Sequence, residues 1–351
     1  MKILKRFLMT GLRAVIGFGL AFYFLHRLFD KKAFVAEISE GSFSFLFLAV
    51  AGYGFALLLS FYRWQKLLDV QGIHIGYGTI TRLGMIGTFF NSCLPGAVSG
   101  DVAKMVYIRH HAPGKRAEAI LTILLDRLLG LFALLIVATI ACILNMSYLL
   151  SAEWRIQAWT IGVGAASTGG ICAILTIVFK NFFLKAPGIL PLVALGRRAL
   201  PDRICGIIER VVNALDLYRN NRVAVAYAMG ISMINHIIMA AILLFVARAI
   251  HEVNVPTSKY LLTSSVSNAV SSIPISPGGF GIRDSITNTF LTQAGAAAGK
   301  AAVAPILVTL VLAFWSLVGG LFYVIGRVGA GQEKSMGAFD SENTSLSENT
   351  Q

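Results

Sequence analysis

Two short segments of the sequence place proline, glycine and charged residues in a similar order. The first runs Asn91-Ser-Cys-Leu-Pro-Gly-Ala-Val-Ser-Gly-Asp101, and the second runs Ser271-Ser-Ile-Pro-Ile-Ser-Pro-Gly-Gly-Phe-Gly-Ile-Arg-Asp284. Proline ends a helix and glycine permits a sharp turn, so each segment should interrupt one helix and begin another. The new helix presents free N–H groups and partial positive charge, which bind phosphate or carboxylate. We interpret the two turns as a substrate site. The alternative is a pair of kinks that only let helices pack.

Ionisable side chains lie beside both turns. Asp101 and Lys104 are three residues apart and can pair on one face of a helix, and the second turn is followed by Arg283-Asp284. A charge at the centre of a bilayer costs about 2.5–3.5 kcal/mol, so such residues need a partner or a wet cavity. We expect Arg283-Asp284 to face a wet functional cavity, with an interfacial ion pair as the alternative.

Asp126 and Arg127 fall early in a long apolar segment. Adjacent residues of a helix point about 100° apart, so each of the two needs a partner on another helix. The alternative is that both lie at the cytoplasmic headgroup level. The full set of candidate substrate-path residues is Asn91, Pro95, Gly96, Gly100, Asp101, Lys104, Asp126, Arg127, Pro274, Ser276, Pro277, Gly278, Gly279, Gly281, Arg283 and Asp284.

The composition indicates that the helices that must position these residues lie mainly in lipid. The chain is 56% hydrophobic and only 13% charged, whereas soluble domains average about 25% charged residues. A span needs roughly 20 apolar residues. Six uninterrupted candidates are present, at 7–25, 43–62, 119–144, 158–179, 223–247 and 302–326, and two broken segments lie at about 83–108 and 260–292. These patterns predict an all-α integral membrane protein with about six full transmembrane helices and two re-entrant hairpins.

The distribution of basic residues predicts the topology. The net charge of +13 does not require a nucleic-acid partner, because the basic residues concentrate in short loops between spans, as the positive-inside rule describes. The rule places both termini and the loop 180–222 in the cytoplasm. One hairpin then enters from the cytoplasm and the other from the exterior, which is the arrangement of an inverted repeat. We expect a multi-pass protein of the cell inner membrane whose partners are membrane lipids.

The domain boundaries follow from composition. We expect one transmembrane domain over residues 1–328 and a disordered cytoplasmic tail over 329–351, where polar residues dominate. An apolar stripe at helical spacing predicts an amphipathic helix at about 202–219 on the cytoplasmic leaflet, with packing under the bundle as the alternative. Asn235 and His236, in the middle of a span, are expected to make interhelical hydrogen bonds, with a proton relay by His236 as the alternative. The sequence shows no metal or cofactor motif, so we expect neither a metal nor a cofactor, and no enzymatic activity.

Three ordered motifs carry a resemblance to a known family. Phe89-Phe90-Asn91-x-x-Leu94-Pro95-Gly96-x-x-x-Gly100-Asp101, then Asp126-Arg127-x-x-Gly130, then Ile273-Pro274-x-Ser276-Pro277-Gly278-Gly279-x-Gly281-x-Arg283 resemble the lysylphosphatidylglycerol synthase transmembrane-region family, also called the flippase-like domain family. The resemblance covers roughly residues 5–328. The chain departs from the family pattern with Ser99, Lys104 and Asp284 where Gly, Arg and Glu are usual. Lys104 cannot grip a phosphate with two parallel hydrogen bonds as arginine does.

The resemblance implies translocation of a phospholipid or polyprenyl-type lipid between leaflets. In some family members such a domain is fused to an aminoacyltransferase domain, which we do not expect here. Two other functions stay open: a polyprenyl-phosphate-dependent glycosyltransferase and a non-catalytic membrane partner of a lipid-modifying enzyme. A glycosyltransferase would need clustered acidic residues for a metal and a nucleotide sugar, and the sequence does not show such a cluster.

Overall fold

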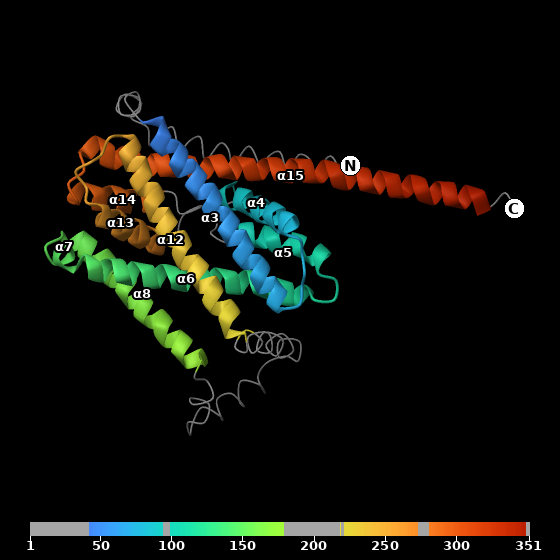
Figure 1. The fold of residues 1–351 in the computed structure, drawn as a ribbon, viewed down its shortest axis with the longest axis horizontal. Coiled ribbons are helices and arrows are strands. Elements are labelled where there is room, and N and C mark those ends of the chain that lie inside the picture. The colour runs from blue at the N-terminus through green and yellow to red at the C-terminus, as the bar shows by residue number, and fades with distance from the viewer. Residues whose placement is uncertain (1–41, 94–98, 179–217, 219–220, 273–280, 349–351) are drawn as a thin grey trace, which may run out of the picture.

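The structure is a computed structural model that describes residues 42–93, 99–178, 218, 221–272 and 281–348. The part of the chain that it describes is built from helices joined by turns (Figure 1). The helices are α3 Phe43–Val70, α4 Tyr77–Cys93, α5 Ser99–His111, α6 Arg116–Leu144, α7 Met146–Leu150, α8 Trp154–Val178, α12 Arg222–Ala249, α13 Thr257–Ser271, α14 Ile282–Gln293 and α15 Ala298–Glu348. The expectation of an all-α membrane protein is confirmed.

Four of these helices are long and apolar enough to cross a membrane. They are α3, α6, α12 and the first 28 residues of α15, Ala298–Ile325. At 1.5 Å per residue, a helix of this length spans about 42 Å, more than the roughly 30 Å of bilayer hydrocarbon. Helix α8 covers most of the predicted span 158–179. The predicted first span, 7–25, and all but one residue of the predicted amphipathic helix 202–219 lie outside the described residues.

The helices form two halves with the same order of lengths. In the first half, α3, α4, α5 and α6 have 28, 17, 13 and 29 residues. In the second half, α12, α13, α14 and the spanning part of α15 have 28, 15, 12 and 28 residues. Both predicted breaks are present, because α4 ends at Cys93 before α5 begins at Ser99, and α13 ends at Ser271 before α14 begins at Ile282. The turn residues between them are outside the described part.

The two halves interlock in an inverted manner. Helices α3 and α12 pack along each other in opposite directions, since the N–H of Ser42, at the start of α3, donates to the carbonyl of Ala249, at the end of α12, at 2.8 Å. Figure 1 shows the two helices crossing side by side. The short helix α4 contacts α15 of the other half, and its counterpart α13 contacts α6. Each hairpin therefore packs against the last long helix of the opposite repeat, as expected for an inverted repeat.

Glycine permits the closest helix contacts of the first hairpin. A Cβ atom on Gly100 would clash with the backbone carbonyl of Gly87, so α5 and α4 touch backbone to backbone. A Cβ atom on Gly319 of α15 would clash in the same way with the carbonyl of Met85 on α4. Small residues that allow such approach are typical of helix interfaces in membranes. These contacts fix α4 between α5 and α15.

Helix α15 continues beyond its spanning part as far as Glu348. The disorder that we expect from residue 329 onward stays a prediction. Figure 1 shows this extension running away from the packed helices. Its dispensability stays a prediction.

Labelling of single cysteines should show that both ends of the first hairpin lie on one side of the membrane. In a chain without its four native cysteines, Cys at Lys66 and at Arg116 should react from the cytoplasm. Cys at Val253, which is 67% exposed, should react from the exterior, and so should Cys at Ala298. Glu252 is buried and unsuited as a labelling site. Reaction of positions 66 and 116 from opposite faces would contradict the re-entrant hairpin.

Removal of the C-terminal segment should leave the membrane domain folded. A chain truncated before Gln332 should insert normally and unfold at the same temperature as the full chain in detergent, because the removed residues follow the spanning part of α15. Thermal unfolding followed by size-exclusion chromatography measures this. A clear fall in unfolding temperature would show that the segment docks on the bundle.

Candidate functional site

An acidic residue occupies the same position in both hairpins. Asp101 is the third residue of α5 and Asp284 is the third residue of α14, the helices that follow the two turns. A negative charge in the first turn of a helix is stabilised by the partial positive charge there. Asp284 also accepts a hydrogen bond from the N–H of Gly281, at 3.3 Å from Oδ2. Each acid thus places a negative charge at the start of the helix that follows a broken turn, and Asp284 also caps that helix start.

The first hairpin carries a cluster of three charges. The Asp101 carboxylate lies 2.7 Å from Arg127 Nε on α6 and 3.7 Å from Lys104 Nζ. The expected pairing of Asp101 with Lys104 is confirmed, but the shorter contact is to Arg127. The Lys104 ammonium also lies 5.4 Å from the centre of the Trp64 ring, within range of a cation–π attraction. The Asp101 side chain is 14% exposed and the Arg127 side chain 47%, so the cluster is open on the arginine side.

The second hairpin carries a buried cluster built on Arg283. Its Nε and Nη2 atoms lie 3.3 and 3.1 Å from Asp284 Oδ1, and Nη2 also donates to the Thr309 hydroxyl of α15. The Thr309 hydroxyl lies 3.2 Å from Asp284 Oδ1 and closes a three-membered network. The Arg283 and Asp284 side chains are 9% and 10% exposed. The cluster therefore lies inside the helix bundle.

The two clusters occupy equivalent places in the repeats. Arg127 is the twelfth residue of α6 and Thr309 is the twelfth residue of α15. In each half, the third residue of the second short helix is an aspartate bound to the twelfth residue of the following long helix. The second half has a hydroxyl where the first has a guanidinium, and it carries its own arginine on the short helix. This correspondence supports the repeat at the level of side-chain contacts.

Asp126 forms a buried ion pair that the sequence did not reveal. Its carboxylate accepts hydrogen bonds from Arg63 Nε at 2.6 Å and Nη2 at 2.9 Å, while Arg63 Nη1 donates to the Ser232 hydroxyl at 2.5 Å. The three residues join α3, α6 and α12. The Arg63 side chain is 9% exposed and that of Asp126 is 14% exposed. Asp126 and Arg127 thus each have a partner on another helix, as expected.

Among the described residues, the second half has no equivalent of this ion pair. The positions that correspond to Arg63 and Asp126 are Ile242, the twenty-first residue of α12, and Val308, the eleventh residue of α15. Both belong to one buried hydrophobic cluster. A charged pair in the first repeat thus corresponds to two apolar positions of one buried cluster in the second.

The other expected site residues have varied surroundings. Gly281 has φ of 86°, which glycine adopts without strain, and Gly100 provides the close contact with Gly87, so both have structural roles. The Asn91 Oδ1 atom is buried without a hydrogen-bond partner among the described residues. The residues Pro95, Gly96, Pro274, Ser276, Pro277, Gly278 and Gly279 lie outside the described part.

The two polar residues of α12 behave as expected. Asn235 Nδ2 donates to the Ser60 hydroxyl of α3 at 2.8 Å, and His236 Nε2 lies 3.0 Å from the carbonyl oxygen of Gly130 on α6. Both are interhelical hydrogen bonds, which confirms the prediction. They tie α12 to α3 and to α6, about one helical turn from the Arg63–Asp126 pair.

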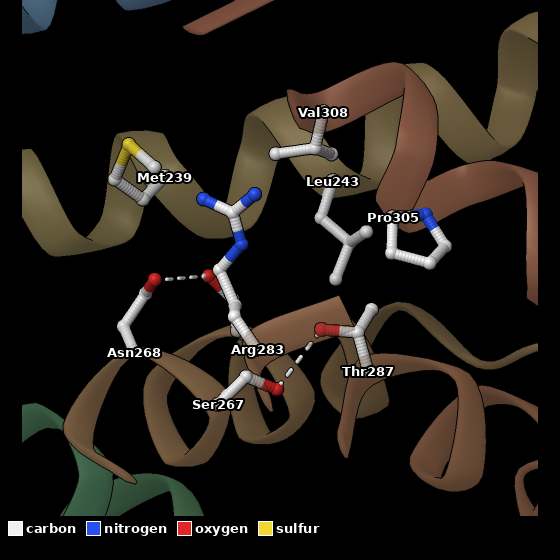
Figure 2. Close-up of a pocket in the computed structure, with 9 residues that line it drawn as sticks. Met239, Leu243, Ser267, Asn268, Arg283, Thr287, Pro305 and Val308 are labelled. Carbon is white, nitrogen blue, oxygen red and sulfur yellow. Dashed lines mark hydrogen bonds between the residues drawn. The ribbon is translucent and has the colours of Figure 1, made fainter. Parts of the chain in front are cut away.

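A narrow pocket lies beside the Arg283 cluster, between α12, α13, α14 and α15 (Figure 2). It holds ≈ 290 Å³ of empty space, including its open side. Its polar lining is Ser264, Ser267, Asn268, Arg283 and Thr287, and its apolar lining is Met239, Leu243, Pro305 and Val308. The sequence analysis included Arg283 but missed the α13 side chains. The hydroxyl-rich run Thr263-Ser-Ser-Val-Ser-Asn268 was a signal that could have found them.

The fold and these clusters define a multi-pass, all-helical membrane protein of the inverted-repeat kind, with a broken helical hairpin in each repeat. The chain belongs to the family described as the lysylphosphatidylglycerol synthase TM region, whose model matches residues 11–320. It is also similar to a UPF0104 membrane protein of Pyrococcus horikoshii, with 22% identity over 300 residues that cover 81% of this chain and 87% of the relative. The family resemblance noted in the sequence is confirmed.

Loss of one partner of the Arg63–Asp126 pair should destabilise the bundle. Asp126→Asn leaves the Arg63 charge buried without its carboxylate, which should cost about 3 kcal/mol of folding free energy. The measurement is thermal or denaturant unfolding in detergent. Glu118→Gln, in the first turn of the same helix, serves as the control and should change stability little.

The exchanged pair Arg63→Asp with Asp126→Arg should recover part of the lost stability, because it restores opposite charges on α3 and α6. If Asp126→Asn unfolds at the same temperature as Glu118→Gln, the ion pair does not hold these helices together.

Proposed function

We propose that this protein moves a phospholipid or polyprenyl-type lipid between the leaflets of the cell inner membrane, with the headgroup handled at the two broken turns. In this proposal both termini are cytoplasmic, as the distribution of basic residues predicts. The protein acts as a transporter rather than an enzyme. The observation that carries the proposal is the pair of equivalent charged clusters, one on each hairpin, formed within interlocked helices of a membrane domain. The family to which the chain belongs is described by a lipid-related activity.

The physical problem of lipid transfer is the cost of removing a headgroup from water. A charged group in an apolar medium must exchange its water for fixed partners, and hydrogen bonds to ionised donors are the strongest replacements. Lys104, Arg127 and Arg283 supply such donors beside the helix N-termini. Because every one of them is paired with an acid in this structure, a bound phosphate would compete with a carboxylate. Pairing with the acid keeps the empty site neutral. Competition with the carboxylate keeps phosphate binding reversible.

Two other functions have less support in the described residues. A glycosyltransferase would need free acidic groups to hold a metal and a nucleotide sugar, yet Asp101, Asp126 and Asp284 are each bound to a basic side chain. A non-catalytic partner of a lipid-modifying enzyme would need no charged path through the membrane domain. Reconstitution of the purified protein separates this last function from transport.

Loss of the positive charges at the first hairpin should slow lipid transfer. In proteoliposomes with a fluorescent anionic phospholipid, Arg127→Ala and Lys104→Ala should each reduce the transfer rate at least about tenfold, which corresponds to about 1.4 kcal/mol. The measurement is the fraction of probe quenched from outside with time. Arg116→Ala, at the exposed start of α6, is the matched control and should transfer lipid at the normal rate.

Lys104→Arg should transfer lipid at least as fast as the natural chain, because arginine can bind a phosphate through two hydrogen bonds. Normal transfer by both alanine variants would place the headgroup path elsewhere. Absence of transfer by the unaltered protein, when folded and reconstituted, would favour the role of a partner to another enzyme.

A further inference from the structure

The Lys104 side chain is restricted to a narrow slot between α3 and α4. Its aliphatic part lies against Gly87 of α4, where an added Cβ atom would lie 2.7 Å from Lys104 Cε and 3.0 Å from Lys104 Cγ. Its ammonium lies 5.4 Å from the centre of the Trp64 ring of α3 and 3.7 Å from Asp101 Oδ1. The side chain is 19% exposed. Glycine at position 87 thus lets a long and flexible side chain reach the face of the indole ring.

The Trp64 ring is itself held in place. The residue is 2% exposed, and its Nε1 donates a hydrogen bond to the Thr122 hydroxyl of α6 at 3.1 Å. That hydroxyl donates in turn to the carbonyl of Ala119 at 2.7 Å. Because an indole has a single N–H, a hydrogen bond to a buried partner fixes the rotation of the ring. Helix α6 therefore sets the direction in which the ring face points.

An aromatic face holds an ammonium without using its hydrogen-bond donors. The attraction comes from the ring quadrupole, and it acts within about 6 Å of the ring centre. An ammonium has three N–H donors, and among the described residues that of Lys104 makes no hydrogen bond, since Asp101 Oδ1 lies 3.7 Å away. Arg127 Nε, by contrast, lies 2.7 Å from the same carboxylate. The Lys104 ammonium is thus located by the ring while its donors stay available.

The second repeat serves as an internal comparison, because it has neutral residues at the same four places. Counted from the first residue of each helix, these are Leu243 for Trp64, Ala304 for Thr122, Ser267 for Gly87 and Thr287 for Lys104. The Thr287 hydroxyl lies 3.0 Å from Ser267 Oγ, so this pair is in contact as Lys104 and Gly87 are. The ring, the acceptor that orients it and the glycine occur together in the repeat that has the lysine.

We propose that Trp64 is a positioning residue of the first hairpin, whose indole face holds the Lys104 ammonium with its N–H donors free for an anion. Trp64 acts through Lys104 and does not itself contact the ligand. The location of the ammonium is independent of any transport activity, whereas its use in lipid transfer rests on the proposed function.

A spectroscopic measurement on the purified full chain in detergent tests the position of the ammonium. Reductive methylation with isotope-labelled formaldehyde converts lysines to dimethyl-lysines, which keep their charge, and a methyl group over an aromatic face resonates upfield. Lys104→Arg identifies the Lys104 signal by removing it. That signal should lie upfield of the lysines without a ring neighbour. It should move to their position in Trp64→Leu, and Trp64→Phe should retain part of the shift.

Two controls separate this effect from a general loss of packing. Lys259 Nζ lies 3.9 Å from the centre of the Tyr148 ring, so its signal should also be upfield and should stay there in every Trp64 variant. Trp315→Phe removes an indole that packs on Gly54, ten residues before Trp64 on α3, and should leave the Lys104 signal unchanged.

The outcomes that would overturn the inference are specific. One is a Lys104 signal among those of the ring-free lysines in the natural chain, and another is an unchanged signal in folded Trp64→Leu. If Trp64→Leu does not fold, Trp64→Phe decides the result, and an undiminished upfield shift in that chain overturns the inference.

Lipid transfer shows whether Trp64 acts through Lys104. In the proteoliposome assay, Trp64→Phe should slow transfer about threefold, because a phenyl face attracts a cation less strongly than an indole face. When Lys104→Ala is already present, the same change should have no further effect. An equal slowing in both backgrounds would show a purely structural role and overturn the inference. If the natural chain transfers no lipid, the proposed function fails, and the methyl signals still decide whether Trp64 positions Lys104.

Discussion

The architecture depends on one contact that is present twice: an aspartate in the first turn of a short helix binds the twelfth residue of the next long helix. In the first half this is Asp101 with Arg127, and in the second it is Asp284 with Thr309. A short helix that starts inside a membrane leaves N–H groups without partners, and an acid near them offsets their partial charge. The acid then needs a donor of its own, which the long helix supplies. One carboxylate thus fixes the start of the short helix and its position against the bundle.

The charged residues that remain are arranged around this contact. Arg63, Asp126 and Ser232 join α3, α6 and α12 next to the first cluster, since Asp126 is followed directly by Arg127. Arg283 extends the second cluster into the pocket. The function we propose uses the same charges for a second purpose, because groups that must be paired to be stable in the bundle are also the groups that can receive a phosphate. Pairing in the empty state keeps them ordered until a ligand competes.

The sequence predicted the class of fold, the two breaks and most of the long helices, because these features depend on local composition. Apolar length is enough to locate α6 or α12, and proline with glycine is enough to locate the ends of α4 and α13. The partners of the charges could not be predicted, since Arg63 and Asp126 are 63 residues apart in the chain and meet only through the packing of three helices. Thr309 was missed because a single hydroxyl in an apolar helix gives no signal of its own.

The unequal cores of the two repeats have a consequence for the balance between conformations. In a transporter built from inverted repeats, the inward-open and outward-open forms arise when the two halves exchange their shapes. Identical halves would make these two forms equal in free energy. Here one half has the Arg63–Asp126 ion pair and the other has Ile242 with Val308 at the same positions, so any distortion costs a different amount in each half. Each 1.4 kcal/mol of difference changes the ratio of two populations about tenfold, so in the transporter that we propose the empty protein would favour opening to one side of the membrane.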